Sequence, residues 1–301
     1  MILGFACIYI VWGSTYLAIS WGVKSIPPFM MGAVRFVIAG AALYAWSRLR
    51  GAQVPTGLQW RNAAIVGGLL LLVGNGAVVW ASKRVDSGVV SLLVATVPLW
   101  LVICEMVQGK RPRIPQLLGV AIGLVGVGLL VLPTNGGAQR GAIDPLGAIV
   151  LSIGSLSWTV GSLFSRGAVF ARPASLASGM QMLAGGAMML AVSLASGELA
   201  RFDLTQVTWQ SLLSVLYLIT FGSLIGFSTY MWLLKVASPT AVGTYAYVNP
   251  LVAVLLGVLL GGERLPAQAV LAMVIIIGGV AMVSLAPQLR GFAERAWNRV
   301  S

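Results

Sequence analysis

The side chains that could bind a small molecule are polar and aromatic residues spaced along otherwise apolar segments. Several recur at intervals of three or four residues, which places them on one face of a helix. Aromatic faces can stack on a ring or hold a cation, and amides can hydrogen-bond a carboxylate or an ammonium. We interpret these residues as the lining of a binding cavity. They are Thr96 and Trp100, Tyr245 and Asn249, and Ser155, Trp158 and Ser162, with Asn75, Tyr9, Trp12 and Tyr230 as further members.

A competing interpretation of aromatic residues is that they mark the two interfaces of a membrane. Trp100 and Trp158 lie well inside their apolar segments, so we assign them to the cavity. Four other tryptophans lie near segment ends and fit the interface. These are Trp46, Trp60, Trp209 and Trp232.

Other chemistries are excluded by the residues that are missing. The chain has no histidine, and its two cysteines, Cys7 and Cys104, lie far apart inside apolar segments. Zinc, haem and iron-sulfur ligand sets, and catalytic triads that need histidine, are therefore excluded. Neither a Walker phosphate loop nor a dinucleotide fingerprint occurs in the sequence. We expect no metal, no cofactor, no catalytic residue and no enzymatic activity.

The composition rules out an ordinary soluble protein. Of 301 residues, 58% are hydrophobic and only 9% are charged, whereas about a quarter of the residues of a soluble domain are charged. The net charge is +12, but the Lys and Arg residues stand in small groups at the ends of apolar stretches. They form no continuous basic face of the kind that binds nucleic acid. The partner indicated by this pattern is a lipid bilayer, with no nucleic acid.

Polar residues divide the chain into apolar segments of about 20 residues, the length at which a helix crosses a bilayer. Backbone groups cannot stay unpaired in lipid, and the segments are too long and too uniformly apolar for barrel strands. We therefore predict an all-α integral membrane protein with ten transmembrane helices and no inserted soluble domain. The segments are 2–21, 28–47, 62–82, 87–107, 115–133, 145–165, 174–195, 209–234, 238–261 and 266–285.

The basic residues also predict the orientation. If the N-terminus is inside, the inner connectors and tail carry about twice as many Lys and Arg residues as the outer connectors. This bias places both termini in the cytoplasm of a bacterial inner membrane protein. The basic tail, 286–301, contains Phe292 and Trp297, and we interpret it as an anchor at the membrane interface rather than a partner-binding element.

The two halves of the chain resemble one another. Shifts of 146 and 152 residues superimpose identical residues, and Arg35 falls on Gln181. Because each half has five segments, an odd number, the second half must be inverted relative to the first. Inverted repeats are typical of secondary transporters, with a substrate site near the midplane. We predict repeats at 1–133 and 145–285, joined by a linker at 134–144. The superimposed pairs are Trp12 and Trp158, Pro27 and Pro173, Gly40 and Gly186, Ala41 and Ala187, Trp80 and Trp232, Lys83 and Lys235, Pro98 and Pro250, and Gln116 and Gln268.

Two prolines and two charges lie inside the segments. Pro98 and Pro250 each remove a backbone hydrogen bond half-way along a segment, and we interpret them as paired hinges or gates, with a static bend as the alternative. For Arg35 we favour a structural role, capping carbonyl groups or bridging helices, over binding of a substrate anion. Glu105 lies near the inner end of its segment, where it can reach the interface.

Energy coupling and oligomeric state are less directly encoded. No carboxylate or histidine lies near the middle of a segment, and proton-coupled carriers generally use such a group. We therefore expect uniport or exchange of a neutral or zwitterionic substrate, because the lining has no counter-charge for a strongly ionic one. Small residues four apart, such as Gly119 and Gly123, allow close helix contacts. We interpret them as internal packing of a monomer, with homodimerisation as the alternative.

Several short motifs resemble the drug/metabolite transporter superfamily. The chain is similar to its EamA-type branch with ten helices, which includes the bacterial aromatic amino acid exporters. This resemblance implies a basket of two inverted repeats, a central cavity lined by the first, third, fourth, sixth, eighth and ninth segments, and export of small metabolites. One departure is that Arg111 falls on the position equivalent to Glu263. The motifs are Trp12-Gly13-Ser14, Arg35-Phe36, the two mid-segment prolines and Gly262-Glu263-Arg264.

These observations favour a secondary transporter that exports amino acids, aromatic ones included, through a central cavity by alternating access. The same aromatic lining suits cationic amphiphilic drugs and other metabolites, which are the alternative substrates. A membrane-embedded enzyme would need a catalytic constellation that the chain lacks. A membrane scaffold without transport activity is the remaining alternative.

Overall fold

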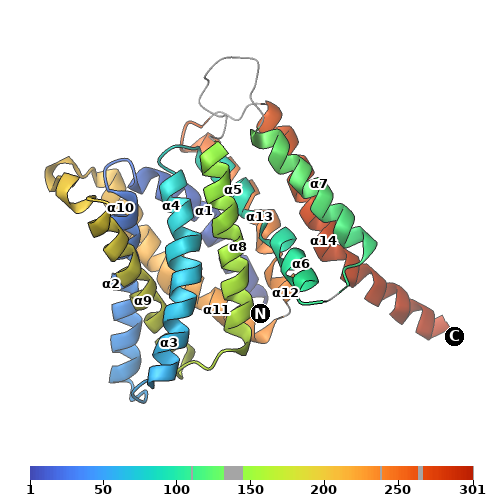
Figure 1. The fold of residues 1–301 in the computed structure, drawn as a ribbon, viewed down its shortest axis with the longest axis horizontal. Helices are drawn as coiled ribbons and strands as arrows, with labels where there is room; N and C mark the ends of the chain where they lie inside the picture. The colour runs from blue at the N-terminus through green and yellow to red at the C-terminus, as the bar shows by residue number, and fades with distance from the viewer. Residues whose placement is uncertain (110, 132–144, 238, 264–266, 301) are drawn as a thin grey trace.

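A computed structural model describes residues 1–109, 111–131, 145–237, 239–263 and 267–300, without the side chains of 130–131, 239–240, 247 and 284–300. In this part of the chain every regular element is a helix, and most helices stand side by side (Figure 1). Seven helical stretches are long and apolar enough to cross a membrane, and three shorter apolar helices accompany them. The prediction of an all-α membrane protein is confirmed at this level, while the number of ten spans stays a prediction.

The first half begins with two long helices, and its third and fourth apolar stretches are each divided into shorter helices. The third apolar stretch starts at Gly57, five residues earlier than predicted, because Thr56 and Gln59 form a reciprocal capping box there. Its middle turns are a π-helix, η1. The elements are α1 (Ile2–Gly22), α2 (Pro28–Leu49), α3 (Gly57–Val66), η1 (Gly67–Asn75), α4 (Gly76–Ala81), α5 (Ser87–Val94), α6 (Val97–Val107) and α7 (Ile114–Val131).

The second half has the same kinds of pieces. Its last helix is longer than predicted and continues as far as Val300, through the predicted tail, because Ala, Leu, Glu and Arg residues with high helix propensity follow the apolar segment. The predicted linker, 134–144, lies outside the described residues. The elements are α8 (Pro145–Gly167), α9 (Ala174–Ala195), η2 (Leu199–Arg201), η3 (Leu204–Gln206), α10 (Trp209–Tyr217), the π-helix η4 (Leu218–Phe227), α11 (Ser228–Val236), α12 (Pro239–Val242), α13 (Tyr245–Leu259) and α14 (Ala267–Val300).

The two proline-containing segments are interrupted upstream of their prolines. A turn at 95–96 separates α5 from α6, and Pro98 lies in the first turn of α6. A turn at 243–244 separates α12 from α13, and Pro250 stays inside α13. Proline is well tolerated in a first helical turn, where its missing N–H would be unpaired anyway. Pro98 thus begins a helix after a break inside its span, and the role of the two prolines as hinges or gates stays a prediction.

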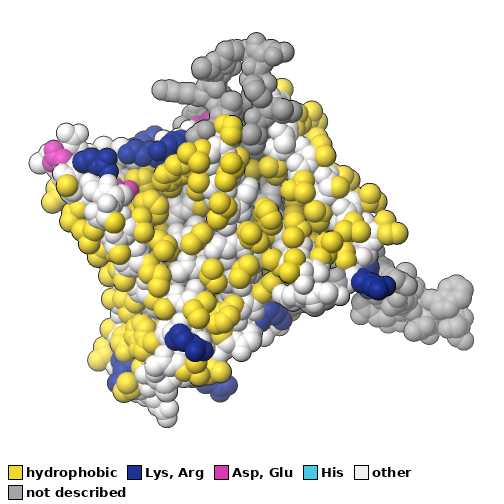
Figure 2. Space-filling view, in the orientation of Figure 1, with side chains coloured by type: hydrophobic (Ala, Val, Ile, Leu, Met, Phe, Trp, Pro, Cys, Tyr) yellow, Lys and Arg dark blue, Asp and Glu magenta, His cyan; other side chains and the backbone are white. Residues whose placement is uncertain are grey.

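The outer surface has the character of a surface covered by lipid. Apolar side chains spread over most of the visible face, and Lys and Arg gather toward its upper and lower edges (Figure 2). Ile38, Leu118, Ile149 and Leu216 are among the large apolar side chains that are exposed. A broad exposed apolar surface bordered by basic residues is the pattern that a bilayer accommodates.

Glycines bring helices from the two halves into close contact. In Figure 1, α2 lies beside α9 at the left and α7 lies beside α14 at the right. A Cβ atom at Gly40 would lie 2.7 Å from the backbone nitrogen of Leu183, so only glycine fits between α2 and α9. Between α7 and α14, a Cβ at Gly119 would lie 2.6 Å from the carbonyl oxygen of Gly279. Gly119 therefore packs within the chain, against α14.

Two carboxylates of the second half cap helices of the first half. Glu198 accepts the first backbone N–H groups of α2 at 2.9 and 3.3 Å, and Glu263 accepts those of α5 at 3.0 and 3.3 Å. Each glutamate follows a glycine with positive φ, Gly197 at 70° and Gly262 at 66°. A carboxylate at a helix N-terminus satisfies unpaired N–H groups and complements the helix dipole. These caps fix α2 and α5 against the second half.

Candidate substrate cavity

A cavity with an empty volume of about 580 Å³ lies between helices of both halves. We call it the Arg35 cavity, after the one charged side chain among its lining residues. The lining consists of Trp12, Thr15, Tyr16, Ile19, Arg35, Gly74, Asn75, Val78, Val94, Leu151, Gly154, Ser155, Trp158 and Tyr245.

Four aromatic rings pack together at one side of this cavity, and three of them, Trp12, Trp158 and Tyr245, line it. Trp12 lies 5.6 Å from Trp158, 4.8 Å from Tyr230 and 5.5 Å from Tyr245, measured between ring centroids. Tyr230 in turn lies 5.5 Å from Trp158 and 5.9 Å from Tyr245. We call these four residues the ring cluster. Edge-to-face and tilted pairs at such distances are favourable beyond the area that they bury.

The π-helices make room for the two tryptophans. A Cβ atom at Gly74, in η1, would lie 2.9 Å from the Trp158 ring, and one at Gly226, in η4, would lie 2.6 Å from the ring nitrogen of Trp12. Glycine is therefore required where each indole meets the backbone of a π-helix. π-helical turns inside α-helices are frequent at functional sites. Sequence periodicity gave no signal for these turns.

Hydrogen bonds hold the ring cluster in place. The indole N–H of Trp158 donates to the Tyr230 hydroxyl at 3.0 Å, and Ser162 shares a second bond with that hydroxyl at 2.7 Å. The indole N–H of Trp12 donates to the carbonyl of Gly222 at 3.3 Å. Buried polar groups with partners fix the orientation of the rings that carry them.

A second pocket of about 410 Å³ lies against the same ring cluster. We call it the Arg166 pocket. Tyr245 lines both hollows, whereas Tyr230 lines only this one and the two tryptophans line only the Arg35 cavity. The rings therefore lie between the two. Its lining consists of Val97, Pro98, Leu101, Thr159, Ser162, Leu163, Arg166, Tyr230, Leu234, Val242, Gly243 and Tyr245.

Two cationic side chains cap helix C-termini beside the Arg166 pocket. Arg166, at the end of α8, donates to the carbonyl of Leu234 at 3.0 Å and to that of Ala237 at 3.1 Å. Lys235, at the end of α11, donates back to the carbonyl of Ser165 at 2.7 Å. Cations at helix C-termini satisfy unpaired carbonyls and complement the dipole. Each of these two helices thus caps the other.

Arg35 reaches the interior of the bundle. Its side chain is 3% exposed, its Nε donates to the Ser223 hydroxyl of η4 at 2.8 Å, and its guanidinium carbon lies 4.7 Å from the centre of the Phe36 ring. It therefore bridges two helices through a hydroxyl rather than through backbone carbonyls. It also lines the cavity, so the expectation of a lining without a counter-charge is corrected. Sequence gives the depth of Arg35 but not the direction in which it points.

The structure brings together about half of the predicted lining. Other predicted residues line neither described pocket and are hydrogen-bonded to neighbouring groups of the protein. Tyr9 bonds Thr244 at 2.5 Å, and Thr96 donates to the carbonyl of Leu93 at 2.6 Å. With its amide oriented to satisfy its neighbours, Asn249 donates to the carbonyl of Tyr9 at 3.0 Å. Predicted residues in the Arg35 cavity are Trp12, Asn75, Ser155, Trp158 and Tyr245; those in the Arg166 pocket are Pro98, Ser162, Tyr230 and Tyr245; Trp100, Glu105 and Pro250 line neither.

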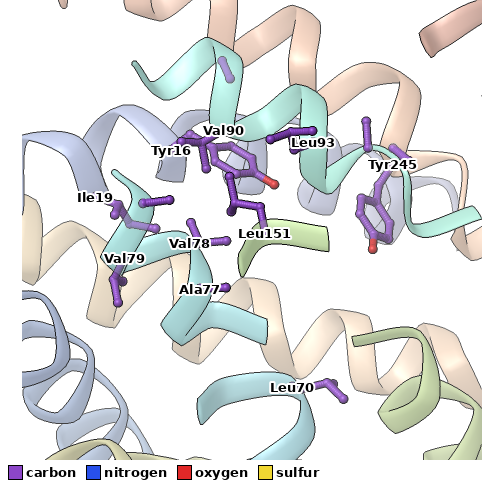
Figure 3. Close-up of a cluster of buried hydrophobic side chains, with 14 of the residues drawn as sticks. Tyr16, Ile19, Leu70, Ala77, Val78, Val79, Val90, Leu93, Leu151 and Tyr245 are labelled. Atoms are coloured by element: carbon purple, nitrogen blue, oxygen red, sulfur yellow. The ribbon is translucent and has the colours of Figure 1, made fainter. Parts of the chain in front are cut away.

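The walls that sequence reasoning missed are mostly apolar. Tyr16, Val78 and Leu151 come from different helices and point toward one another (Figure 3). Val78 and Leu151 carry no sequence signal, because any apolar residue of a span can face lipid or protein. Tyr16 lies four residues after Trp12, and this helical spacing could have found it.

These features define a multi-pass membrane protein with a cavity between its two halves. The model of the EamA-like transporter family matches residues 1–132 and 145–285. The chain belongs to this family of transporters.

Two relatives and one solved structure illustrate the similarity. The chain is 42% identical over 285 residues to the uncharacterized inner membrane transporter YedA of Escherichia coli K12, covering 94% of this chain and 90% of the relative. It is 27% identical to Protein PecM of Dickeya dadantii, over 91% and 88% of the two chains. One crystal structure matches with a TM-score of 0.65 at 24% identity, over 94% of this chain and 96% of the other, which shows the fold alone. The predicted location, as a multi-pass protein of the inner membrane, is confirmed.

Proposed function

We propose that the protein is a secondary transporter that exports small zwitterionic or neutral metabolites, with amino acids, aromatic ones included, as the first candidates. The observation that carries this proposal is a pair of hollows on either side of one ring cluster. A carrier with alternating access needs a site that opens to one side of the membrane at a time. Movement of the ring cluster would connect the Arg35 cavity to the Arg166 pocket.

Ten spans in two inverted repeats are part of the proposal, with α7, α12 together with α13, and α14 completing the set. Equivalent contacts support it. The sequence shifts place Gly226 on Gly74 and Trp158 on Trp12. The contact of Gly74 with Trp158 therefore has its equivalent in the contact of Gly226 with Trp12. The π-helices η1 and η4 also occupy equivalent positions, 67–75 and 218–227.

The proposed orientation places both termini in the cytoplasm. In Figure 1 the two termini lie in the lower half of the view, as this orientation requires. The Arg35 cavity, on the second half of α1, would then lie toward the outer side, and the Arg166 pocket, at the ends of α8 and α11, toward the cytoplasm. Substrate would enter past Arg166 and leave past Arg35.

Uniport or exchange is the proposed mode. Among the described residues, no carboxylate lines either hollow, and proton-coupled carriers generally place one in the pathway. Cationic amphiphilic drugs are the alternative substrates, favoured by the aromatic rings, which can hold a cation.

Efflux from liposomes tests the proposal. Purified full-length protein is reconstituted with internal radiolabelled phenylalanine, leucine or glutamate, or with a quaternary ammonium dye, and protein-free liposomes are the control. Protein-dependent efflux of phenylalanine at equal internal and external pH supports the proposal. Efflux of the dye alone supports the alternative substrates. Efflux of phenylalanine that occurs only with an imposed pH gradient contradicts the uncoupled mode.

A further inference from the structure

We propose that Arg35 is the binding site for a carboxylate of the substrate, and that the Arg35 cavity takes small aromatic or apolar carboxylates, α-amino acids among them. This inference deepens the proposed transport function and rests on it for its biological meaning. The binding that it predicts can be measured without transport. It is carried by a buried cation that lines a cavity and has no anionic partner among the described residues.

The first step is the incomplete hydrogen bonding of the guanidinium. Nε is occupied by Ser223, but Nη1 is buried and has no partner in the described part of the chain. Gly222 adjoins the other arm, since a Cβ there would lie 2.7 Å from Nη2. A guanidinium presents its N–H donors in a planar fork that matches a carboxylate. The bond to Ser223 orients the guanidinium and leaves its Nη1 N–H donors for a ligand.

The second step is the missing counter-charge. No carboxylate of the described residues forms an ion pair with Arg35. Glu198 and Glu263 are already occupied, because Glu198 caps α2 and Glu263 caps α5. A buried cation without an anion is costly, and such a cost is kept where the partner arrives with function. A purely structural bridge to Ser223 needs no positive charge, and an amide would serve.

The third step is the chemistry of the rest of the cavity. Asn75 lines it, and its buried carbonyl oxygen also has no partner among the described residues. This oxygen can accept a hydrogen bond from an ammonium group. Trp12 and Trp158 supply flat apolar surfaces beside these two polar groups. Carboxylate, ammonium and ring of an aromatic amino acid each have a matching group, whereas a cationic drug would meet the like charge of Arg35.

The test compares ligands that differ only in the carboxylate. Binding of phenylalanine and phenylalaninamide, and of phenylacetate and phenylacetamide, is measured by titration calorimetry on the purified full-length protein in detergent. Loss of hydrogen bonds to a charged group reduces affinity at least about tenfold. We therefore expect wild-type protein to prefer each carboxylate over its amide by about that factor, and Arg35→Gln to lose the preference while it still binds the amides.

Two further variants keep the test specific. Gln181→Met is the matched control, because Gln181 is the repeat equivalent of Arg35, is fully buried with unpartnered amide atoms, and lines neither hollow. It should leave the preference unchanged. Arg35→Lys keeps the charge without the planar fork and should keep part of the preference, and it carries the test if Arg35→Gln does not fold.

Three outcomes overturn the inference. They are equal binding of each acid and its amide by wild-type protein, an unchanged preference in Arg35→Gln, and no binding of either acid. The liposome assay decides the transport function separately. Carboxylate binding without efflux would contradict transport and support the site, and efflux without a preference for carboxylates would do the reverse.

Discussion

The Arg35 cavity and the Arg166 pocket share the ring cluster but differ in the state of their polar groups. In the Arg35 cavity, an arginine nitrogen and the Asn75 oxygen are buried without partners. In the Arg166 pocket, Ser162 and Thr159 are hydrogen-bonded, and Arg166 binds the carbonyl groups at the end of α11. The Arg35 cavity therefore has two unpartnered polar atoms from residues that line it alone. The polar side chains of the Arg166 pocket are hydrogen-bonded, except for the Tyr245 hydroxyl, whose residue lines both hollows.

This difference indicates different functions for the two hollows. Unpartnered buried polar groups are costly in a folded protein and are expected where a ligand completes them. Fully paired groups stabilise one arrangement of the helices. We therefore propose the Arg35 cavity as the place where substrate binds, and the Arg166 pocket as a closed passage held by reciprocal helix caps. Four substitutions test this division, in order of decreasing effect.

Removal of the Trp158 ring should merge the two hollows. Trp158→Ala deletes a ring that contacts two other members of the ring cluster, and the free energy of unfolding should fall by about 3 kcal/mol. Liposomes with this variant should leak phenylalanine without saturation. Trp46→Ala, at a tryptophan that is 56% exposed on α2, is the matched control and should alter neither property. Saturable efflux like that of wild-type protein would contradict the ring cluster as the barrier.

Loss of one hydroxyl should loosen the ring cluster without removing a ring. Tyr230→Phe leaves the Trp158 N–H and the Ser162 hydroxyl without their shared partner, at a cost of about 1–3 kcal/mol in the free energy of unfolding. Thermal unfolding of the purified variant checks this. Tyr217→Phe is the comparison. The Tyr217 hydroxyl contacts Ser14 at 2.6 Å, and Tyr217 lines neither hollow. A raised midpoint in Tyr230→Phe would show that the bonds do not stabilise the cluster.

Replacement of Asn75 should separate binding from stability. Asn75→Leu removes an unpartnered oxygen, so the unfolding midpoint should stay the same or rise, while the KM for phenylalanine efflux should rise about tenfold. Concentration-dependent efflux and thermal unfolding on one preparation check both effects. A lower midpoint with an unchanged KM would mean that Asn75 serves the fold rather than the substrate.

The opposite pair of effects, lower stability with unchanged binding, is expected for a residue of the Arg166 pocket. Thr159→Val removes a hydroxyl that donates to the carbonyl of Ser155 at 2.9 Å, so the free energy of unfolding should fall by about 1 kcal/mol. Affinity for phenylalanine, measured by calorimetry, should not change. If Thr159→Val weakened phenylalanine binding as much as Asn75→Leu does, the division between the two hollows would be wrong.

Sequence patterns found the parts of the site that follow helix periodicity. Trp158 and Ser155 share one face of α8, and both line the Arg35 cavity. Trp100 lines neither described pocket, although its backbone N–H donates to the carbonyl of Thr96 at 3.2 Å and the predicted helical spacing is present. Arg35 was found as a buried charge, but its position at the cavity depends on Ser223, which lies 188 residues further along the chain.

The helix ends show the same division. The capping box of Thr56 and Gln59 is a local pattern of three-residue spacing that could be read directly from the sequence. Glu198 caps α2 through residues that precede it in the chain by 168 and 169 positions, and no local sequence pattern predicts this contact. Such contacts depend on which helix ends lie next to each other.

The sequence by itself determined that this protein is helical and membrane-embedded, since long uncharged stretches have only one stable form in lipid. It also determined the internal resemblance of the halves, because identical residues recur at fixed shifts. Only the tertiary structure decided which polar groups meet partners and which face a cavity. That outcome depends on packing between helices distant in sequence, because a side chain inside a bundle is satisfied by its neighbours in space rather than along the chain.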